Sequence, residues 1–478
     1  MATAADASSQ AAPGSASAAG TAALNARLLP ASTGGGAEGC CDYELQARPV
    51  AASQAQPSRW IDACFIALGA ASDITFNGVV LSVAYLREEL GDNVLTLIGQ
   101  AHFWGSGGMM LLMFALALRN PGGMVQSLPS QCQSLLVTML YMLSLNSALL
   151  LTALCSWPLS AGLLRFTILL NGASTGSAQS LVGLFSGLMT KFGGQPTCAA
   201  AQMGGVGFGI ALPTVLQLAL LPFGISARRV AGLSYALAVA IILLGIAALA
   251  ALRRTEAFRR CEHGGVDEMS GRPGVAAAVS KSFGFWILAR LRHVGLQSLA
   301  LGIGFASTVY SGLLTPHVPP RGSLPARELL PTLLMGTNNV CDFAGRFISL
   351  RILRTTEPVM LVAVAKRLLH WLPFAAVCLV IRVTLVAAGV KYCVDDITFV
   401  SNGPVVFLYA TGAFMGGLTT IALTQQAQSV CMLKSGPNMD EASSLPCPLA
   451  TQTMFLAGIL GAIAGTMLPF PSTGIAQI

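Results

Sequence analysis

Charged residues are scarce in this sequence, and their scarcity excludes most classes of soluble protein. Asp, Glu, Lys and Arg make up 10% of the 478 residues, whereas a typical soluble domain contains about 25%. The hydrophobic fraction is 54% and the mean hydropathy is +0.68. So few charges cannot cover a water-soluble surface, which excludes an ordinary cytosolic enzyme, a nucleic-acid-binding protein and a secreted disulfide scaffold. The composition therefore predicts an all-α polytopic membrane protein.

Motifs for metal binding and nucleotide hydrolysis are also missing. No pair of the 12 cysteines has the spacing of a zinc site, and neither a Walker loop nor a His-Glu-x-x-His sequence occurs. We therefore expect a protein that is not an enzyme and that uses no metal and no cofactor.

Eleven segments are long and apolar enough to cross a bilayer, which takes roughly 20 mostly apolar residues. The predicted spans lie near residues 60–86, 94–118, 130–154, 159–190, 196–222, 229–252, 286–314, 328–350, 358–389, 403–433 and 448–470. A long, basic, Gly-rich stretch after the sixth span divides them into six and five, as a linker between two bundles would. The predicted organisation is a tail (1–59), an N-terminal bundle (60–252), a basic cytosolic loop (253–285) and a C-terminal bundle (286–478).

Charge placement predicts the orientation of the chain. Residues 1–59 contain too few large apolar side chains to order themselves, so this segment is predicted to be a disordered tail. If the N-terminus is inside, most of the 27 Lys and Arg residues fall in inner segments. The positive-inside rule therefore predicts a cytosolic N-terminus, and eleven spans place the C-terminus outside.

A group of polar residues interrupts the eighth predicted span. Asn339, Asp342 and Arg346 are three and four residues apart, which places all three on one face of a helix. Pairing of the two opposite charges lowers the cost of holding them away from water. An amide beside a carboxylate offers donors and acceptors that suit a polar, uncharged ligand such as a sugar or a base. The same ion pair can instead serve only to tie this span to its neighbours.

The first predicted span carries a second polar group. Phe76 places an aromatic ring beside the amide of Asn77, and Asp73 precedes them with no cation within one helical turn. Asp73 must therefore pair with a residue of another span, such as Arg165, line a water-filled cavity, or be protonated. The last case would allow coupling of transport to protons.

The sequence resembles the equilibrative nucleoside transporter family. Residues 339–346 read Asn-Val-Cys-Asp-Phe-Ala-Gly-Arg, which is similar to the family's Asn-x-x-Asp-x-x-Gly-Arg signature in an eighth span. The segment Leu68–Tyr85 resembles the family's first helix, with Phe76 and Asn77 where many members have Trp-Asn. Further likeness lies in the small-residue segments 171–187 and 204–209 of the fourth and fifth spans.

The resemblance implies a fold of 11 helices similar to the major facilitator superfamily, in halves of six and five, around a central cavity for a nucleoside. It implies that Asn339 and Asp342 bind the permeant, and that Arg346 supports Asp342 and contacts the ribose. The resemblance also implies that Phe76 and Asn77 line the cavity.

The fourth span departs from the family pattern by one position. Ala178 stands where many members have a Gln that contacts the base, and Gln179 follows it. We therefore count Gln179 among the expected binding residues.

Together with the polar residues in the spans, this resemblance predicts a facilitative, alternating-access carrier for purine nucleosides such as adenosine, or for nucleobases. We expect a monomer in the plasma membrane whose partners are the permeant and the lipid bilayer, and which binds no nucleic acid. The first alternative is a proton-coupled nucleoside or nucleobase symporter that uses Asp73 as its titrating group. A more distant alternative is a polytopic receptor or scaffold.

Overall fold

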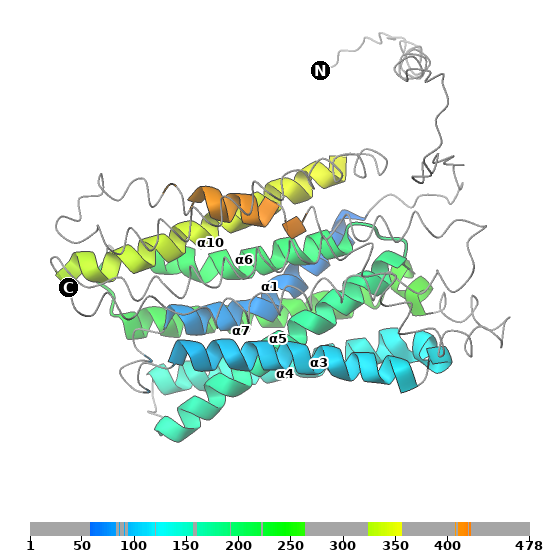
Figure 1. Cartoon of the computed structure of the whole chain (residues 1–478), viewed down its shortest axis with the longest axis horizontal. Coiled ribbons are helices and arrows are strands. Elements are labelled where there is room, and N and C mark those ends of the chain that lie inside the picture. Colours follow the sequence, from blue (N-terminus) through cyan, green and yellow to red (C-terminus); the bar gives the residue numbers. More distant parts are fainter. Residues whose placement is uncertain are drawn as a thin grey trace, which may run out of the picture. The chain divides into compact units, whose positions relative to one another are not determined.

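The structure is a computed structural model of the chain, and its long helices are shown in Figure 1. It describes residues 58–82, 86, 90, 94–119, 121–155, 160–191, 193–220, 223–262, 324–355, 407, 410–418 and 420–421. The long helices are α1 (Arg59–Leu81), α3 (Val94–Arg119), α4 (Pro121–Cys155), α5 (Ala161–Lys191), α6 (Cys198–Leu220), α7 (Ala227–Leu252) and α10 (Leu324–Thr355). These residues are helical with short connections, and no strand occurs among them.

The long helices coincide with seven of the eleven predicted spans, namely the first six and the eighth. Three helices differ from the prediction by four residues or more, and one of them, α10, covers Leu324–Thr355 rather than residues 328–350. α1 ends at Leu81 rather than near residue 86, and α4 begins at Pro121 rather than near residue 130. Proline is favoured at the first position of a helix because its missing N–H would have no partner there, so Pro121 is a suitable start.

The remaining spans are covered only in part. Within the predicted tenth span, residues 410–418 are helical. The predicted spans 286–314, 358–389 and 448–470 lie outside the described residues, as does nearly all of the predicted tail 1–59. The count of eleven spans, the division into two bundles and the orientation of the termini therefore stay predictions.

Four described helices are long and apolar enough to cross a membrane by themselves. They are Arg59–Leu81, Pro129–Leu154, Cys198–Leu220 and Arg228–Leu252. α5 and α10 are less apolar because they carry many of the polar residues discussed below. The protein is therefore an integral membrane protein.

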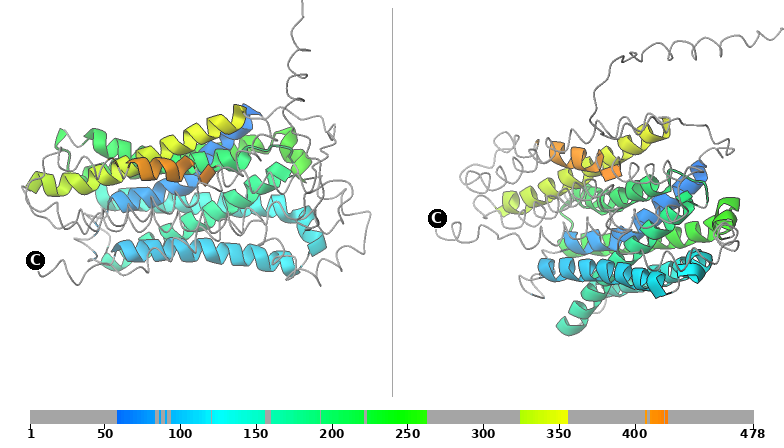
Figure 2. Two further views of the ribbon diagram at one scale, coloured as in Figure 1. Left: turned by 45° about the horizontal axis from the view of Figure 1, so that its top comes forward. Right: turned by 45° about the vertical axis from the view of Figure 1, so that its right-hand side comes forward.

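α1 and α6 run parallel and in close contact, and they lie side by side in the views of Figures 1 and 2. Gly205 lies against the backbone of Ile66, and Gly209 lies against the backbone of Ala70. The contacts therefore advance in the same direction along both helices. Glycine is needed at these crossings because a Cβ atom would meet the neighbouring backbone, and small residues of this kind let membrane helices approach closely.

α7 and α10 each run antiparallel to one of these two helices. On α7, Gly245 faces Ala71 of α1, and Tyr235 faces Gly78 further along α1. α10 packs on α6 in the same opposed sense, and its contact pairs are Gly336 with Leu218 and Leu350 with Gly204. These directions are those expected for first, fifth, sixth and eighth spans that alternate across a bilayer.

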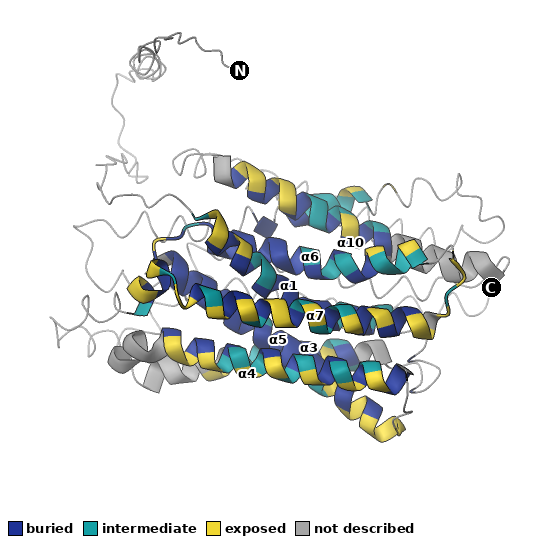
Figure 3. Ribbon diagram, turned by 180° about the vertical axis from the view of Figure 1, so that it is seen from behind, coloured by how far each residue is buried: buried dark blue, intermediate teal, exposed yellow. Residues whose placement is uncertain are grey.

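Helix α1 is central among the described helices and is mostly buried. Figure 3 shows that α7, in contrast, alternates between buried and exposed residues along its length. A core of apolar side chains joins α1 to α4, α5, α6 and α7. In this core the ring centroids of Phe65 and Phe185 are 5.6 Å apart, and those of Phe185 and Phe258 are 5.9 Å apart. This packing fixes the relative positions of α1 and α5, which both contribute polar residues to the candidate site.

Candidate functional site

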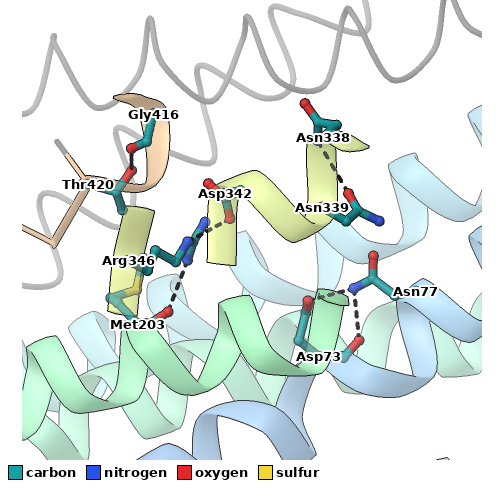
Figure 4. A network of polar contacts seen from close by, with 9 residues as sticks. All are labelled: Asp73, Asn77, Met203, Asn338, Asn339, Asp342, Arg346, Gly416 and Thr420. Carbon is teal, nitrogen blue, oxygen red and sulfur yellow. Dashed lines mark hydrogen bonds and ion pairs between the residues drawn. The ribbon is translucent and has the colours of Figure 1, made fainter. Parts of the chain in front are cut away.

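A buried carboxylate on α1 accepts hydrogen bonds from two amide side chains. Asn77 Nδ2 donates to Asp73 Oδ2 at 2.6 Å and to the Asp73 carbonyl oxygen at 3.2 Å. Gln179 Nε2, on α5, donates to Asp73 Oδ1. Asp73 is 4% exposed, whereas both amides are only half-buried. The three residues therefore form a polar cluster whose amides remain partly accessible; Figure 4 shows its α1 members.

Local spacing and helix packing bring this cluster together. Asp73 and Asn77 are four residues apart, which places them one turn apart on the same face of α1. Gln179 reaches them because α5 packs on α1, where Thr75 Oγ1 and Thr175 Oγ1 are 3.4 Å apart.

Arg165, suggested above as a partner of Asp73, bonds elsewhere. Its Nη2 donates to the carbonyl oxygen of Leu90 at 3.1 Å, and Arg165 itself is exposed. Asp73 is therefore held by amides rather than by this cation.

The eighth-span residues form the ion pair that their spacing predicts. Arg346 Nε lies 2.7 Å from Asp342 Oδ2, and both side chains are almost fully buried. Arg346 Nη1 also donates to the Met203 carbonyl oxygen of α6 at 3.1 Å. The stem of Arg346 fits against Gly207, where a Cβ atom would lie 2.7 Å from Arg346 Cδ. Arg346 thus pairs with Asp342 on its own helix and also bonds to the neighbouring helix α6.

Asn339 uses both ends of its amide. Its Nδ2 donates to Thr214 Oγ1 of α6 at 2.9 Å, and its Oδ1 accepts from Asn338 Nδ2 at 3.2 Å. Asn338 and Thr214 were not among the residues predicted from the sequence. Their polar character was visible, but only the packing of α10 on α6 identifies them as partners of Asn339.

The α1 and α10 groups lie near one another. Helix α6 lies between them: Gly207 lies against Arg346 of α10, and Gly209 lies against Ala70 of α1. Figure 4 shows Asp73 and Asn77 in one close view with Asn339, Asp342 and Arg346. The fold therefore brings predicted residues of the first, fourth and eighth spans into one region.

The ring of Phe76 packs against a neighbouring ring. Its centroid lies 4.5 Å from that of the His102 ring on α3, with 39° between the planes. Phe76 is half-buried and also packs against a cluster of buried apolar side chains that includes Val79 and Tyr235. The contact with His102 was not predicted, because it depends on how α3 packs against α1.

The segment around residues 410–418 packs against the eighth-span motif. Gly417 lies against the Asp342 backbone, and Gly345 lies against the Phe414 backbone. The adjacent Gly416 makes no such close approach, since a Cβ atom there would lie more than 4 Å from other atoms. The contact is made by the next glycine because helix rotation, which spacing alone does not define, selects the face that meets α10.

A Gly-x-Ser-x-Gly sequence at residues 172–176 does not form a hydrolase nucleophile. In such enzymes the serine stands on a sharp turn between a strand and a helix. Here Ser174 is buried in the interior of α5. The described geometry therefore gives this sequence a packing role.

Comparison with known proteins identifies the fold. Among solved structures, the chain is similar to a major facilitator superfamily transporter, FucP, in the outward conformation, with a TM-score of 0.52 and 15% identity. It is also similar to a variant of the E. coli fucose:proton symporter FucP, with a TM-score of 0.51 and 14% identity. Each comparison covers 84% of this chain and 89% of the other. The chain has the major facilitator fold.

The sequence comparisons add no narrower family. No family model matches the chain, and no curated protein matches it. The fold agrees with the major-facilitator-like fold expected from the resemblance. The count of eleven helices and their division into six and five stay predictions, and the nucleoside substrate is a proposal.

Proposed function

We propose that this protein is a facilitative carrier that moves purine nucleosides such as adenosine, and nucleobases, across the membrane. The observation that carries the proposal is the gathering of buried polar groups from α1, α5 and α10 within a major facilitator fold. Polar groups are costly inside a bilayer, so such a cluster marks a substrate pathway by default.

The chemistry of the cluster suits a nucleoside. Asn77 and Gln179 offer amide groups of the kind that read the edge of a base. The carboxylate of Asp342 can accept hydrogen bonds from ribose hydroxyls, and Arg346 holds that carboxylate in place. Phe76 supplies an aromatic surface beside Asn77. No covalent step is required, because weak, reversible binding is sufficient for a carrier.

Alternating access requires contacts between the two bundles that can be exchanged. α6 belongs to the predicted N-terminal bundle and α10 to the predicted C-terminal bundle. They are joined by the bonds from Asn339 to Thr214 and from Arg346 to the Met203 carbonyl. The neutral bond contributes about 1 kcal/mol net and the bond from the charged guanidinium about 1.5–3 kcal/mol, so rocking of one bundle against the other can break and remake them.

The second candidate function is proton-coupled symport through Asp73. The observation that favours this function is that Asp73 bonds to two amides. Among the described residues, no cation bonds directly to its carboxyl group. A carboxyl group held in this way can gain and lose a proton during a transport cycle.

Uptake of labelled adenosine by liposomes containing the purified protein tests the proposal. We expect uptake to stop at equal concentrations inside and outside, with competition by nucleosides and nucleobases but not by L-fucose. Protein-free liposomes and the Phe347→Leu variant, altered at an exposed position of α10, are the controls. Failure to move any nucleoside or nucleobase would overturn the proposal and leave a receptor or scaffold. Accumulation driven by an imposed pH gradient would instead establish the symporter.

A further inference from the structure

Asp73 constrains the orientation of two amide groups at the candidate site. Each of its carboxylate oxygens accepts a hydrogen bond from a different amide nitrogen, one on Asn77 and one on Gln179. In this geometry the Asp73 side chain acts only as an acceptor, and each amide turns its NH2 group toward it. Because an amide is planar, its oxygen then points away from Asp73. Figure 4 shows this for Asn77, whose oxygen lies on the side away from Asp73.

The consequence is that both amides offer acceptors rather than donors. Among the described residues, Asn77 Oδ1 and Gln179 Oε1 have no hydrogen-bond partner, and both residues are partly accessible. Asn339 differs, since both ends of its amide are bonded to Thr214 and Asn338. Two carbonyl oxygens from α1 and α5 are thus available to meet the edge of a base.

We propose that Asp73 is a positioning residue that fixes both amides as acceptors and thereby selects bases that carry N–H donors. This inference rests on the proposed function and deepens it by defining a substrate class. The exocyclic amino group of adenine carries two N–H donors, one for each oxygen. A purine with an ether oxygen at the same position places an acceptor against two acceptors and is rejected.

The substitution Asp73→Asn tests the role because it preserves size and changes donor pattern. Asn has one carbonyl oxygen and one NH2 group, so it satisfies only one amide in the original orientation. The other amide must rotate and present its NH2 group instead. The expected change is therefore a weaker preference for bases that carry N–H donors. A simple loss of packing would have no reason to weaken that particular preference.

The measurement compares adenosine with 6-methoxypurine riboside as competing permeants in the same liposomes. We expect the wild-type protein to favour adenosine at least about tenfold in Vmax/KM, which corresponds to about 1.4 kcal/mol. In Asp73→Asn the preference should fall at least about fivefold, chiefly through slower adenosine uptake. The matched control is Asp62→Asn, a second buried aspartate of α1 that is bonded to Thr197 and lies outside the site. Its ratio should equal that of the wild type.

A second variant keeps the test decisive if Asp73→Asn does not fold. Gln179→Met removes one acceptor and leaves Asp73 in place, so it should also lower the preference for adenosine. If the wild type carries nucleosides and both folded variants keep its ratio, this inference is wrong although the proposed function stands. If the wild type carries no nucleoside or nucleobase, the proposed function itself fails.

Discussion

Asp342→Asn is expected to lower adenosine uptake at least about 100-fold while the protein still reaches the membrane. The substitution keeps the shape of the side chain but removes the charge that pairs with Arg346 at 2.7 Å. The substitution also removes the charged acceptor proposed for the ribose hydroxyls. A hydrogen bond to a charged group contributes about 1.5–3 kcal/mol, and about 3 kcal/mol corresponds to roughly 100-fold. Arg346 keeps its bond to the Met203 carbonyl, which helps α10 stay on α6.

The measurement is uptake of labelled adenosine by cells, divided by the amount of protein labelled at the cell surface. Phe347→Leu is the matched control, because it alters an exposed residue one position after Arg346 on the same helix. Normal uptake by Asp342→Asn at normal abundance would contradict the placement of the site.

A double-mutant cycle separates the two members of the pair. Arg346→Ala should be harmful mainly because it removes the cation that lies 2.7 Å from the buried Asp342 carboxylate. The double variant, with both residues replaced by Ala, should then take up adenosine no more slowly than Asp342→Ala or Arg346→Ala alone. If the two losses are additive, the residues act independently and the pair is not a unit.

Gly205→Val is expected to remove most of the folded protein. A Cβ atom at this position would overlap the backbone of Ile66, and a backbone atom cannot move aside as a flexible side chain can. α1 and α6 would have to separate, which would also open the core around Phe65. Overpacking costs about 1–3 kcal/mol when neighbours can adjust, and here the obstacle is rigid.

The measurement is the amount of protein that elutes as a single species from size-exclusion chromatography after extraction in detergent. Gly204→Ala is the control at the adjacent position. Its new Cβ atom would lie 3.4 Å from Leu350 Cδ2, the end of a flexible side chain. We expect near-normal yield for Gly204→Ala and little or none for Gly205→Val. Equal yields would show that α1 and α6 do not cross as closely as described.

Features determined by local spacing were predictable from the sequence. The Asp342–Arg346 pair follows from residues four apart on one helix, and so does the contact between Asp73 and Asn77. Long apolar runs predicted seven helices at nearly the observed positions, because the bilayer requires such runs whatever the tertiary arrangement.

Features determined by helix packing were not predictable. Asp73 and Gln179 are far apart in the sequence, and nothing in either segment identifies the other as its partner. Arg165 was a reasonable electrostatic choice, yet the rotation of α5 directs it to the Leu90 carbonyl. The same limit applies to Asn339, whose bond to Thr214 depends on the register between α10 and α6.

A structure of the purified protein with adenosine bound tests the central claim most directly. The account predicts that the base amino group lies within hydrogen-bond distance of Asn77 Oδ1 or Gln179 Oε1. It also predicts a ribose hydroxyl within the same distance of the Asp342 carboxylate, so that one molecule contacts both α1 and α10. Adenosine bound at a place that touches neither Asp73's amide partners nor Asp342 would contradict the account.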